Sequence, residues 1–206
     1  MQVIQDPLGI IPDQYTGEEI QSDASTTGES DQEIEMIYGT ASERLLAVNA
    51  WHDIAGTLSA RFQVHDKNGI AVQRTVTKGD YLRIDIPGPG SAEGDGFDWV
   101  IVEELKEINT EELKCIGFRV RPTASPLAGE KRIAHFYDPS ATSTFMITCS
   151  GKTVSASITD RNLRPNKQSA GADKIRATAV GLSAISLFSK IQWQQLANAL
   201  IKTMKL

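Results

Sequence analysis

The sequence predicts a mainly β protein: an antiparallel β-barrel or sandwich of about eight short strands, with two C-terminal α-helices and a flexible acidic N-terminal arm. Three observations lead to this fold class. Short apolar stretches separated by turn residues fill the middle of the chain, helical spacing appears near the end, and the first 36 residues contain no Lys or Arg. We therefore divide the chain into an acidic arm (1–36), a barrel or sandwich domain (37–165) and a helical segment (172–206) that packs on the barrel or on a partner.

The two ends of the chain differ in charge. The net charge is −5, but nine of the 26 acidic residues lie in the first 36 positions. Residues 14–35 are polar and poor in aromatic side chains, so they bury too little apolar surface to offset their ordering entropy. The arm is either a solubilising tail or a segment that orders on a partner. In the second case its apolar anchor is Leu8, Ile10, Ile11 and Tyr15.

The strands are predicted from a period of two. In residues 58–64, Leu58, Ala60, Phe62 and Val64 alternate with polar residues, which is typical of a half-buried strand. The Asn-Gly pair at 68–69 then predicts a hairpin turn, because both turn positions need positive φ. Similar stretches at 70–76, 81–86, 98–105, 114–122, 132–138, 143–150 and 153–160 complete the predicted set.

A glycine-rich loop, GSAEGDGF at residues 90–97, precedes one of these strands. It lacks the Lys and Ser/Thr of a phosphate-binding loop, and its acidic residues oppose phosphate. Calcium binding through its carboxylates has no repeat spacing to support it, and a plain connection between strands explains the glycines equally well. Because long loops often carry function, we expect a contact surface formed by Glu93, Asp95, Phe97 and Trp99.

Basic residues cluster after the last predicted strand, in residues 159–176. The cluster could contact the phosphates of a nucleic acid, but no stacked-aromatic pattern accompanies it. The alternative is a solvated or salt-bridged loop, or a docking site for the acidic arm of the same or a neighbouring subunit. The residues of this basic patch are Arg161, Arg164, Lys167, Lys174 and Arg176.

The end of the chain reads as two helices divided at Ser189, a plausible N-cap. The second helix carries an apolar stripe that covers its own domain or docks a partner. This stripe includes Ile191, Trp193, Leu196, Leu200 and Met204. The segment contains too many Ser, Gln and Asn residues for a membrane-spanning helix, so we expect no membrane partner.

No catalytic, metal or cofactor motif is recognisable. Cys115 and Cys149 lie in apolar, strand-like stretches, which favours buried free thiols over a disulfide or a zinc site. The three histidines show no metal-ligand spacing, and a pair of His135 with either cysteine would need strands to bring them together. We expect neither a metal nor a cofactor, and enzymatic activity is the weaker hypothesis.

The function expected from these features is a non-enzymatic interaction or assembly protein that self-associates or binds another protein. A nucleic-acid-binding barrel that uses the basic patch is one alternative, and a barrel that binds a small molecule or carbohydrate is another. The first residues lack the basic start and apolar core of a secretory signal, so a cytoplasmic location is expected.

Overall fold

The computed structural model describes residues 6–56, 60–86, 92–128, 132–166 and 179–203, and within these it does not describe the side chains of residues 92 and 179–186. In the described residues the mainly β character is confirmed, because the strands form one antiparallel sheet of seven in the order β1-β7-β6-β5-β4-β3-β2. The strands are β1 (Glu18–Thr27), β2 (Arg61–His65), β3 (Tyr81–Asp85), β4 (Asp98–Asn109), β5 (Leu113–Pro122), β6 (Thr142–Ser150) and β7 (Thr153–Leu163). The helices are α1 (Asp31–Leu46), α2 (Trp51–Ala55) and α4 (Ala179–Leu200), with 3₁₀ turns η1 (Val48–Ala50) and η2 (Ala92–Gly94).

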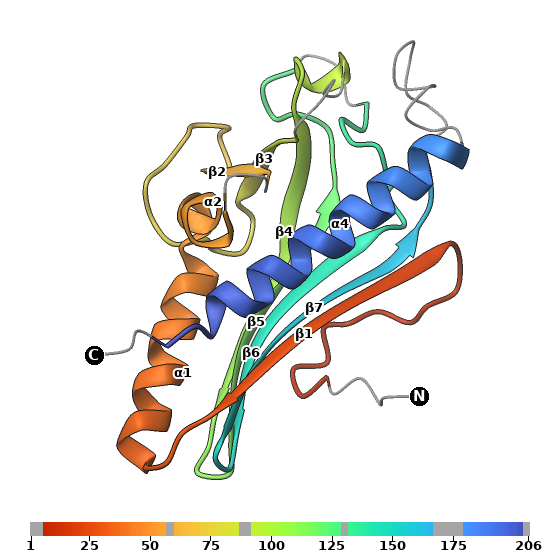
Figure 1. The fold of residues 1–206 in the computed structure, drawn as a ribbon. Helices are drawn as coiled ribbons and strands as arrows, with labels where there is room; N and C mark the ends of the chain where they lie inside the picture. Colours follow the sequence, from red (N-terminus) through yellow and green to blue (C-terminus); the bar gives the residue numbers. More distant parts are fainter. Residues whose placement is uncertain (1–5, 57–59, 87–91, 129–131, 167–178, 204–206) are drawn as a thin grey trace.

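The sheet is open, so the prediction of a barrel or a sandwich is wrong: the described strands form one sheet that neither closes on itself nor packs on a second sheet. Its edge strands β1 and β2 do not pair with each other. Helices cover one face instead of a second sheet: α4 runs diagonally across the strands and packs against β1, while α1 packs against β6 (Figure 1). We call this covered side the inner face. A helix-covered sheet needs no closure, because the helices bury the apolar side chains of that face.

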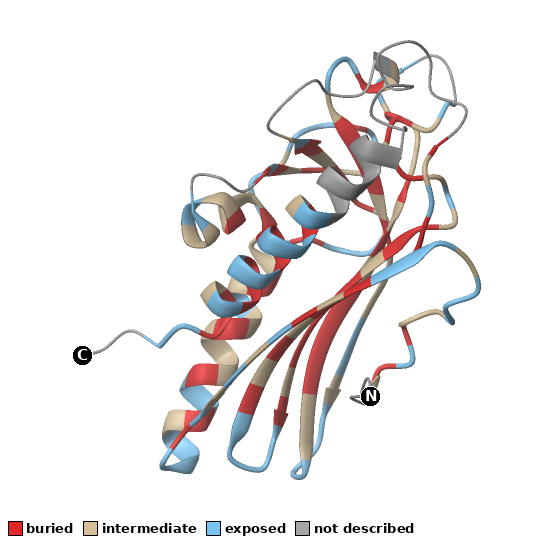
Figure 2. Cartoon of the chain, turned by 45° about the vertical axis from the view of Figure 1, so that its right-hand side comes forward, coloured by how far each residue is buried: buried red, intermediate tan, exposed pale blue. Residues whose placement is uncertain are grey.

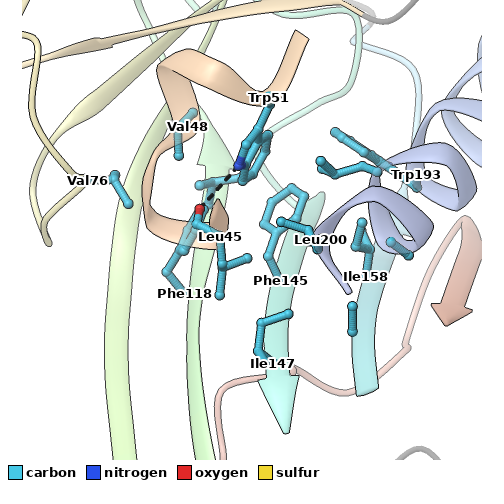
Figure 3. Close-up of a cluster of buried hydrophobic side chains, with 14 of the residues drawn as sticks. Leu45, Val48, Trp51, Val76, Phe118, Phe145, Ile147, Ile158, Trp193 and Leu200 are labelled. Carbon is cyan, nitrogen blue, oxygen red and sulfur yellow. Dashed lines mark hydrogen bonds between the residues drawn. The ribbon is translucent and has the colours of Figure 1, made fainter. Parts of the chain in front are cut away.

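The core lies between the inner face and these helices. Phe118 on β5 and Phe145 on β6 stack with ring centroids 5.1 Å apart, and Trp51 approaches Phe145 to 4.9 Å. Trp193 of α4 meets Phe145 edge-on at 5.2 Å, which completes the aromatic cluster drawn in Figure 3. Such pairs add stability beyond the burial of their area. The core therefore fixes α4 and the start of α2 on the same part of the sheet.

The two long helices are also joined at their C-terminal ends. The Arg44 guanidinium donates hydrogen bonds to the carbonyls of Ala199, Leu200 and Lys202, at 3.3, 3.2 and 2.7 Å. The last carbonyls of a helix lack partners within the helix and carry partial negative charge. A cation from α1 therefore caps α4.

The prediction of a flexible arm is wrong for residues 18–36. Residues 18–27 form β1, which pairs with β7, and α1 begins at Asp31. Two side-chain hydrogen bonds fix the start of this helix. The N-cap Ser30 accepts from the Glu33 N–H at 3.2 Å, and the Glu33 carboxylate accepts from the N–H of Glu29, the residue before the N-cap, at 2.8 Å. The helix buries one apolar face, formed by Ile34, Ile37, Ala41 and Leu45. The low overall apolar content of the segment gave no indication of this face.

Two predicted strands are absent as such. Residues 70–76 form only the bridge between His65 and Ala71, and residues 132–138 only the bridges of Ile133 to Ala124 and of Tyr137 to Pro165. A turn is present near residues 68–69, but it spans residues 66–69, closed by the Gly69 N–H on the Asp66 carbonyl at 2.9 Å. Of the predicted pair only Gly69 has a positive φ, +79°. The turn does not join two strands, because the chain after it leaves the sheet.

The two predicted C-terminal helices are, in the described residues, one helix that passes through Ser189 without a break. Ser189 is buried and does not cap a helix start. The local N-cap signal is overridden by packing on its C-terminal side, where Trp193, Leu196 and Leu200 are buried in the core.

Candidate functional site

An open cleft of about 830 Å³ lies at one end of the sheet, where the β4–β5 and β6–β7 turns meet the start of α1. These elements lie together at the lower end of Figure 1, and their tips are exposed in Figure 2. Three segments far apart in the sequence therefore form its walls. The lining residues are Asp31, Ile34, Glu35, Asn109, Thr110, Glu111, Glu112, Leu113, Lys114, Cys149, Gly151 and Lys152.

Local hydrogen bonds shape the walls of the cleft. In the β4–β5 turn, the Thr110 hydroxyl donates to the carbonyl of Leu113 at 2.9 Å and accepts from its N–H at 3.1 Å. In the β6–β7 turn, Gly151 takes a φ of +55°, a conformation that glycine adopts without strain. The third wall is the first turn of α1, which the Ser30 side chain caps. The side chains of Glu111 and Glu112 are exposed on this rigid frame.

The charges of the cleft are unbalanced. Lys114 forms an ion pair with Glu35 across the cleft, and Lys152 lies 3.5 Å from the carbonyl oxygen of Glu29. Among the described residues, no ion pair involves Asp31, Glu111 or Glu112. Four carboxylates and two lysines line the cleft, so the lining has a net charge of −2, and three of the carboxylates have no ion-pair partner among the described residues.

Cys149 lies in the cleft but is a poor nucleophile. Burial raises the pKa of its thiol, the nearby charge of Glu35 raises it further, and Lys114 lowers it. A thiol with a raised pKa carries little thiolate at neutral pH. Cys115 is also free and buried, and it lies on the opposite face of the sheet. The structure thus provides no paired cysteines and, among the residues it describes, no group of three potential metal ligands.

The predicted loop surface lies at the other end of β4, about 35 Å from the cleft for a strand of this length. Trp99 is 1% exposed and belongs to the protein interior. Phe97 packs under the Arg83 guanidinium, 4.3 Å from its ring centroid, and Asp95 is exposed with a φ of +54°. Glu93 lies in η2 and has interactions of its own. The structure does not bring these residues together with the cleft.

The described part of the basic patch is paired with carboxylates. Arg161 forms an ion pair with Glu19 of β1, and Arg164 lies 3.5 Å from Asp138. Lys167, Lys174 and Arg176 lie outside the described residues. The contact between Arg161 and Glu19 joins the basic end of the chain to its acidic beginning within one molecule.

The predicted partner helix turns most of its apolar stripe inward. Trp193, Leu196 and Leu200 are buried against the sheet, whereas Ile191 is 51% exposed and Met204 lies outside the described residues. The Trp193 indole N–H donates to the Asp160 carboxylate at 2.9 Å. This stripe therefore belongs mainly to the core of its own chain.

The predicted N-terminal apolar anchor is likewise buried in part and exposed in part. Leu8 and Ile10 are 5% and 1% exposed, Ile11 is partly buried, and Tyr15 is 70% exposed. Leu8 and Ile10 pack on the outer face of the sheet, the face opposite α1 and α4. They lie far from the cleft residues on α1, which are on the inner face.

Sequence reasoning missed the cleft because its walls meet only in the folded chain. One signal was available: the S-D-Q-E stretch at residues 30–33 is a capping box and predicts a helix start. The turns after β4 and β6 lie in polar sequence that favours turns, but nothing in that sequence indicates that both turns lie beside this helix. In the described residues, no helix has both the length and the hydropathy needed to cross a membrane.

Comparison with known proteins gives weak similarities in structure alone. No protein-family model matches the chain, and no curated protein matches it. The hypothetical protein jhp0584 from Helicobacter pylori is 12% identical with a TM-score of 0.48, over 96% of this chain and 95% of that one. Major latex-like protein 151 from Panax ginseng is 14% identical with a TM-score of 0.35, over 85% and 97%. A norcoclaurine synthase point mutant from Thalictrum is 10% identical with a TM-score of 0.35, over 87% and 94%. At these identities and scores, none of them supports an inference about what this chain binds or catalyses.

Proposed function

We propose that the protein binds a small organic cation, a molecule with two or more amino groups, in the cleft between α1 and the two turns. The observation that carries this proposal is the cleft itself, a concavity of about 830 Å³ whose lining has a net charge of −2 and three carboxylates without an ion-pair partner among the described residues. Its volume falls within the range of about 300–1,000 Å³ that is typical of ligand sites.

The chemistry of the lining favours a cation with a short apolar spacer. Ammonium groups pair with carboxylates such as Glu111 and Glu112, while Ile34 and Cys149 offer apolar surface to methylene groups between them. Exposed ion pairs contribute only about 0.2–1 kcal/mol each, so we expect weak binding, with a dissociation constant on the order of millimolar or above. Screening of exposed charges should weaken binding as salt increases.

The test is calorimetric titration of the full chain with spermidine at low and high salt, with succinate as the anionic control. We expect saturable, salt-sensitive binding of spermidine only, weakened about tenfold in the double variant Glu111→Gln/Glu112→Gln. The matched control is Glu43→Gln/Asp53→Asn, which removes the same charge from exposed positions outside the cleft. Absence of saturable binding, or an equal loss in both double variants, would overturn the proposal.

The assembly role expected from the sequence is a separate proposal. It does not need the cleft. Two residues of the expected N-terminal anchor, Leu8 and Ile10, pack on the outer face within one chain. Nucleic-acid binding is less well supported, because each described arginine of the basic patch lies beside a carboxylate, which reduces the positive charge available to phosphates.

A further inference from the structure

We propose that the outer edge of β1 binds an extended peptide segment that carries apolar side chains on one side and basic side chains on the other. The segment adds a strand to the sheet, antiparallel to residues 21–25, and its apolar side chains pack against α4. The proposal is independent of the cleft and of its ligand. It follows from backbone groups that β1 turns outward, from an apolar flank of α4 above them, and from the charges on either side.

β1 lies at one margin of the sheet, with β7 on one side and no strand on the other among the described residues (Figure 1). The Gly28 N–H donates to the Lys152 carbonyl at 3.2 Å, which continues the register of β1 with β7. Because hydrogen-bonded and non-hydrogen-bonded pairs alternate in an antiparallel ladder, the even-numbered residues of β1 bond to β7. The odd-numbered residues Gln21, Asp23 and Ser25 therefore turn their N–H and C=O groups away from β7. We call this row of backbone groups the free edge.

A contact from α4 supports this direction. The Gln194 side chain donates to the Asp23 carbonyl at 2.8 Å, so this carbonyl is within reach of α4. A carbonyl oxygen has two lone pairs, so it can also accept from an added strand. In the part of the chain that the structure describes, no other side chain bonds to the outward backbone groups of residues 21–25. Such a row of backbone groups is the surface to which extended peptides add by main-chain hydrogen bonding.

α4 presents apolar side chains above the free edge. Leu187 and Ile191 are 60% and 51% exposed. Gln194 follows them at helical spacings of i+7 and i+3, so all three lie on the flank of α4 that contacts β1. Alternate side chains of a strand point to the same face of a sheet. A strand added at the free edge therefore places every second side chain against Leu187 and Ile191.

The charges differ between the two sides of this edge. Ile20 points to the core, so Asp23 points to the outer face, where it is exposed. Asp23 has no ion-pair partner among the described residues. Lys190 is exposed on α4, which covers the inner face. A basic side chain of the added strand is therefore favoured beside Asp23 on the outer side and disfavoured on the inner side.

A second copy of β1 fits the free edge less well than such a segment. Residues 21–27 read QSDASTT, so a second β1 brings only small or polar side chains to the flank of α4. It also brings a second acidic strand without Lys or Arg. A segment that alternates basic and apolar residues meets both the charge of Asp23 and the apolar flank.

Fluorescence anisotropy tests the proposal with the full chain and a labelled, acetylated hexapeptide of alternating lysine and valine. Three matched probes replace valine with serine, lysine with glutamate, or valine with proline, which lacks the N–H. We expect saturable binding of the lysine–valine probe, and binding at least about fivefold weaker for each of the others. Affinity for the lysine–valine probe should fall as salt increases.

Variants of the chain locate the bound probe. Ser25→Pro removes one outward N–H and keeps the ladder with β7, because edge strands tolerate proline where the N–H faces solvent. We expect it to weaken binding at least about fivefold, whereas Ser25→Ala, which keeps the N–H, should bind as the wild type does. Leu187→Gln/Ile191→Gln should weaken binding by a similar factor. Its matched control is Ile70→Gln/Leu127→Gln, which changes two residues that are each 61% exposed and lie outside β1 and α4. Circular dichroism verifies that each variant is folded.

The cleft variant Glu111→Gln/Glu112→Gln is measured as well, because the probe is cationic, and its affinity should be unchanged. A loss of binding in this variant would place the probe in the cleft and overturn the proposal. Absence of saturable binding, or wild-type affinity in either Ser25→Pro or Leu187→Gln/Ile191→Gln, would also overturn it. Light scattering tests the other occupant: a wild-type dimer that Ser25→Pro abolishes would assign the free edge to a second copy instead of a peptide.

Discussion

At the residue scale, Asp160 of β7 has a carboxylate in a place where ionisation is costly. The side chain points to the inner face and is 2% exposed beneath α4. Burial raises its pKa to about 6, although hydrogen bonds from Ser143 and Trp193 lower it. The folded chain therefore binds this proton more tightly than the unfolded chain, in which the ordinary value is 3.8.

This shift makes stability depend on pH in a defined direction. Between about pH 4 and 6 the folded state holds more protons at Asp160 than the unfolded state, so the free energy of unfolding falls as pH rises through this window. The cost at pH 7 is about 3 kcal/mol. We expect Asp160→Asn to stabilise the chain by about 1–3 kcal/mol at pH 7, because the amide is neutral and still accepts from Trp193.

Urea denaturation of the wild type and Asp160→Asn at pH 4 and pH 7 measures this effect. The two proteins should be nearly equal in stability at pH 4 and should differ at pH 7. A variant that is less stable than the wild type at pH 7 would show that the carboxylate stabilises the folded state.

At the scale of the element, α1 depends on its first turn. The helix begins within a polar segment, and the Ser30 side chain supplies a partner for the Glu33 N–H, which the helix itself leaves unpaired. The Glu33 carboxylate in turn accepts from the Glu29 N–H just before the helix. Asp31 and Glu33 in the same turn also complement the positive end of the helix dipole. The same turn forms one wall of the cleft, so its order matters to the candidate site.

We expect Ser30→Ala to lower the free energy of unfolding by about 1 kcal/mol, because it removes the side-chain cap. Ser25→Ala is the matched control, since Ser25 is an exposed residue of β1 and its loss should change stability by less than about 0.5 kcal/mol. Chemical denaturation of both variants provides the comparison. Equal effects would mean that the cap does not determine the start of α1.

At the scale of the whole molecule, the N-terminal residues complete the sheet. β1 covers the edge of β7 along residues 18–27, and Ile20 contributes to the main hydrophobic core. α4 packs against β1 as well as β7, and its Gln194 donates to the Asp23 carbonyl at 2.8 Å. The acidic beginning of the chain is thus part of the domain, and the pair of Glu19 with Arg161 lies within one molecule.

A chain that begins at Met36 should therefore fail to fold. It lacks β1 and the first turn of α1, so it exposes the edge of β7 and leaves α4 without one of its supports. A chain that begins at Gly17 should fold, because it loses residues 6–16 but keeps all seven strands of the sheet. Circular dichroism and size exclusion distinguish the two, and a folded, monomeric chain from Met36 would contradict this account.

The sequence by itself determined the local features whose physics is local. Short apolar stretches at residues 98–105, 114–122 and 143–150, with turn residues between them, correctly indicated β4, β5 and β6, because these strands bury runs of apolar side chains. The buried stripe of Trp193, Leu196 and Leu200 was equally visible as helical spacing.

Only the tertiary structure decided which segments pair and which polar residues meet. Residues 18–27 have little β propensity, and they form a strand because β7 offers an edge and α4 covers the result. The packing of residues 6–16 on the outer face and the walls of the cleft depend on contacts between positions roughly a hundred residues apart, such as Ile10 with Arg119 or Glu35 with Lys114. Local patterns carry no information about such distances, because they are set by how the layers pack.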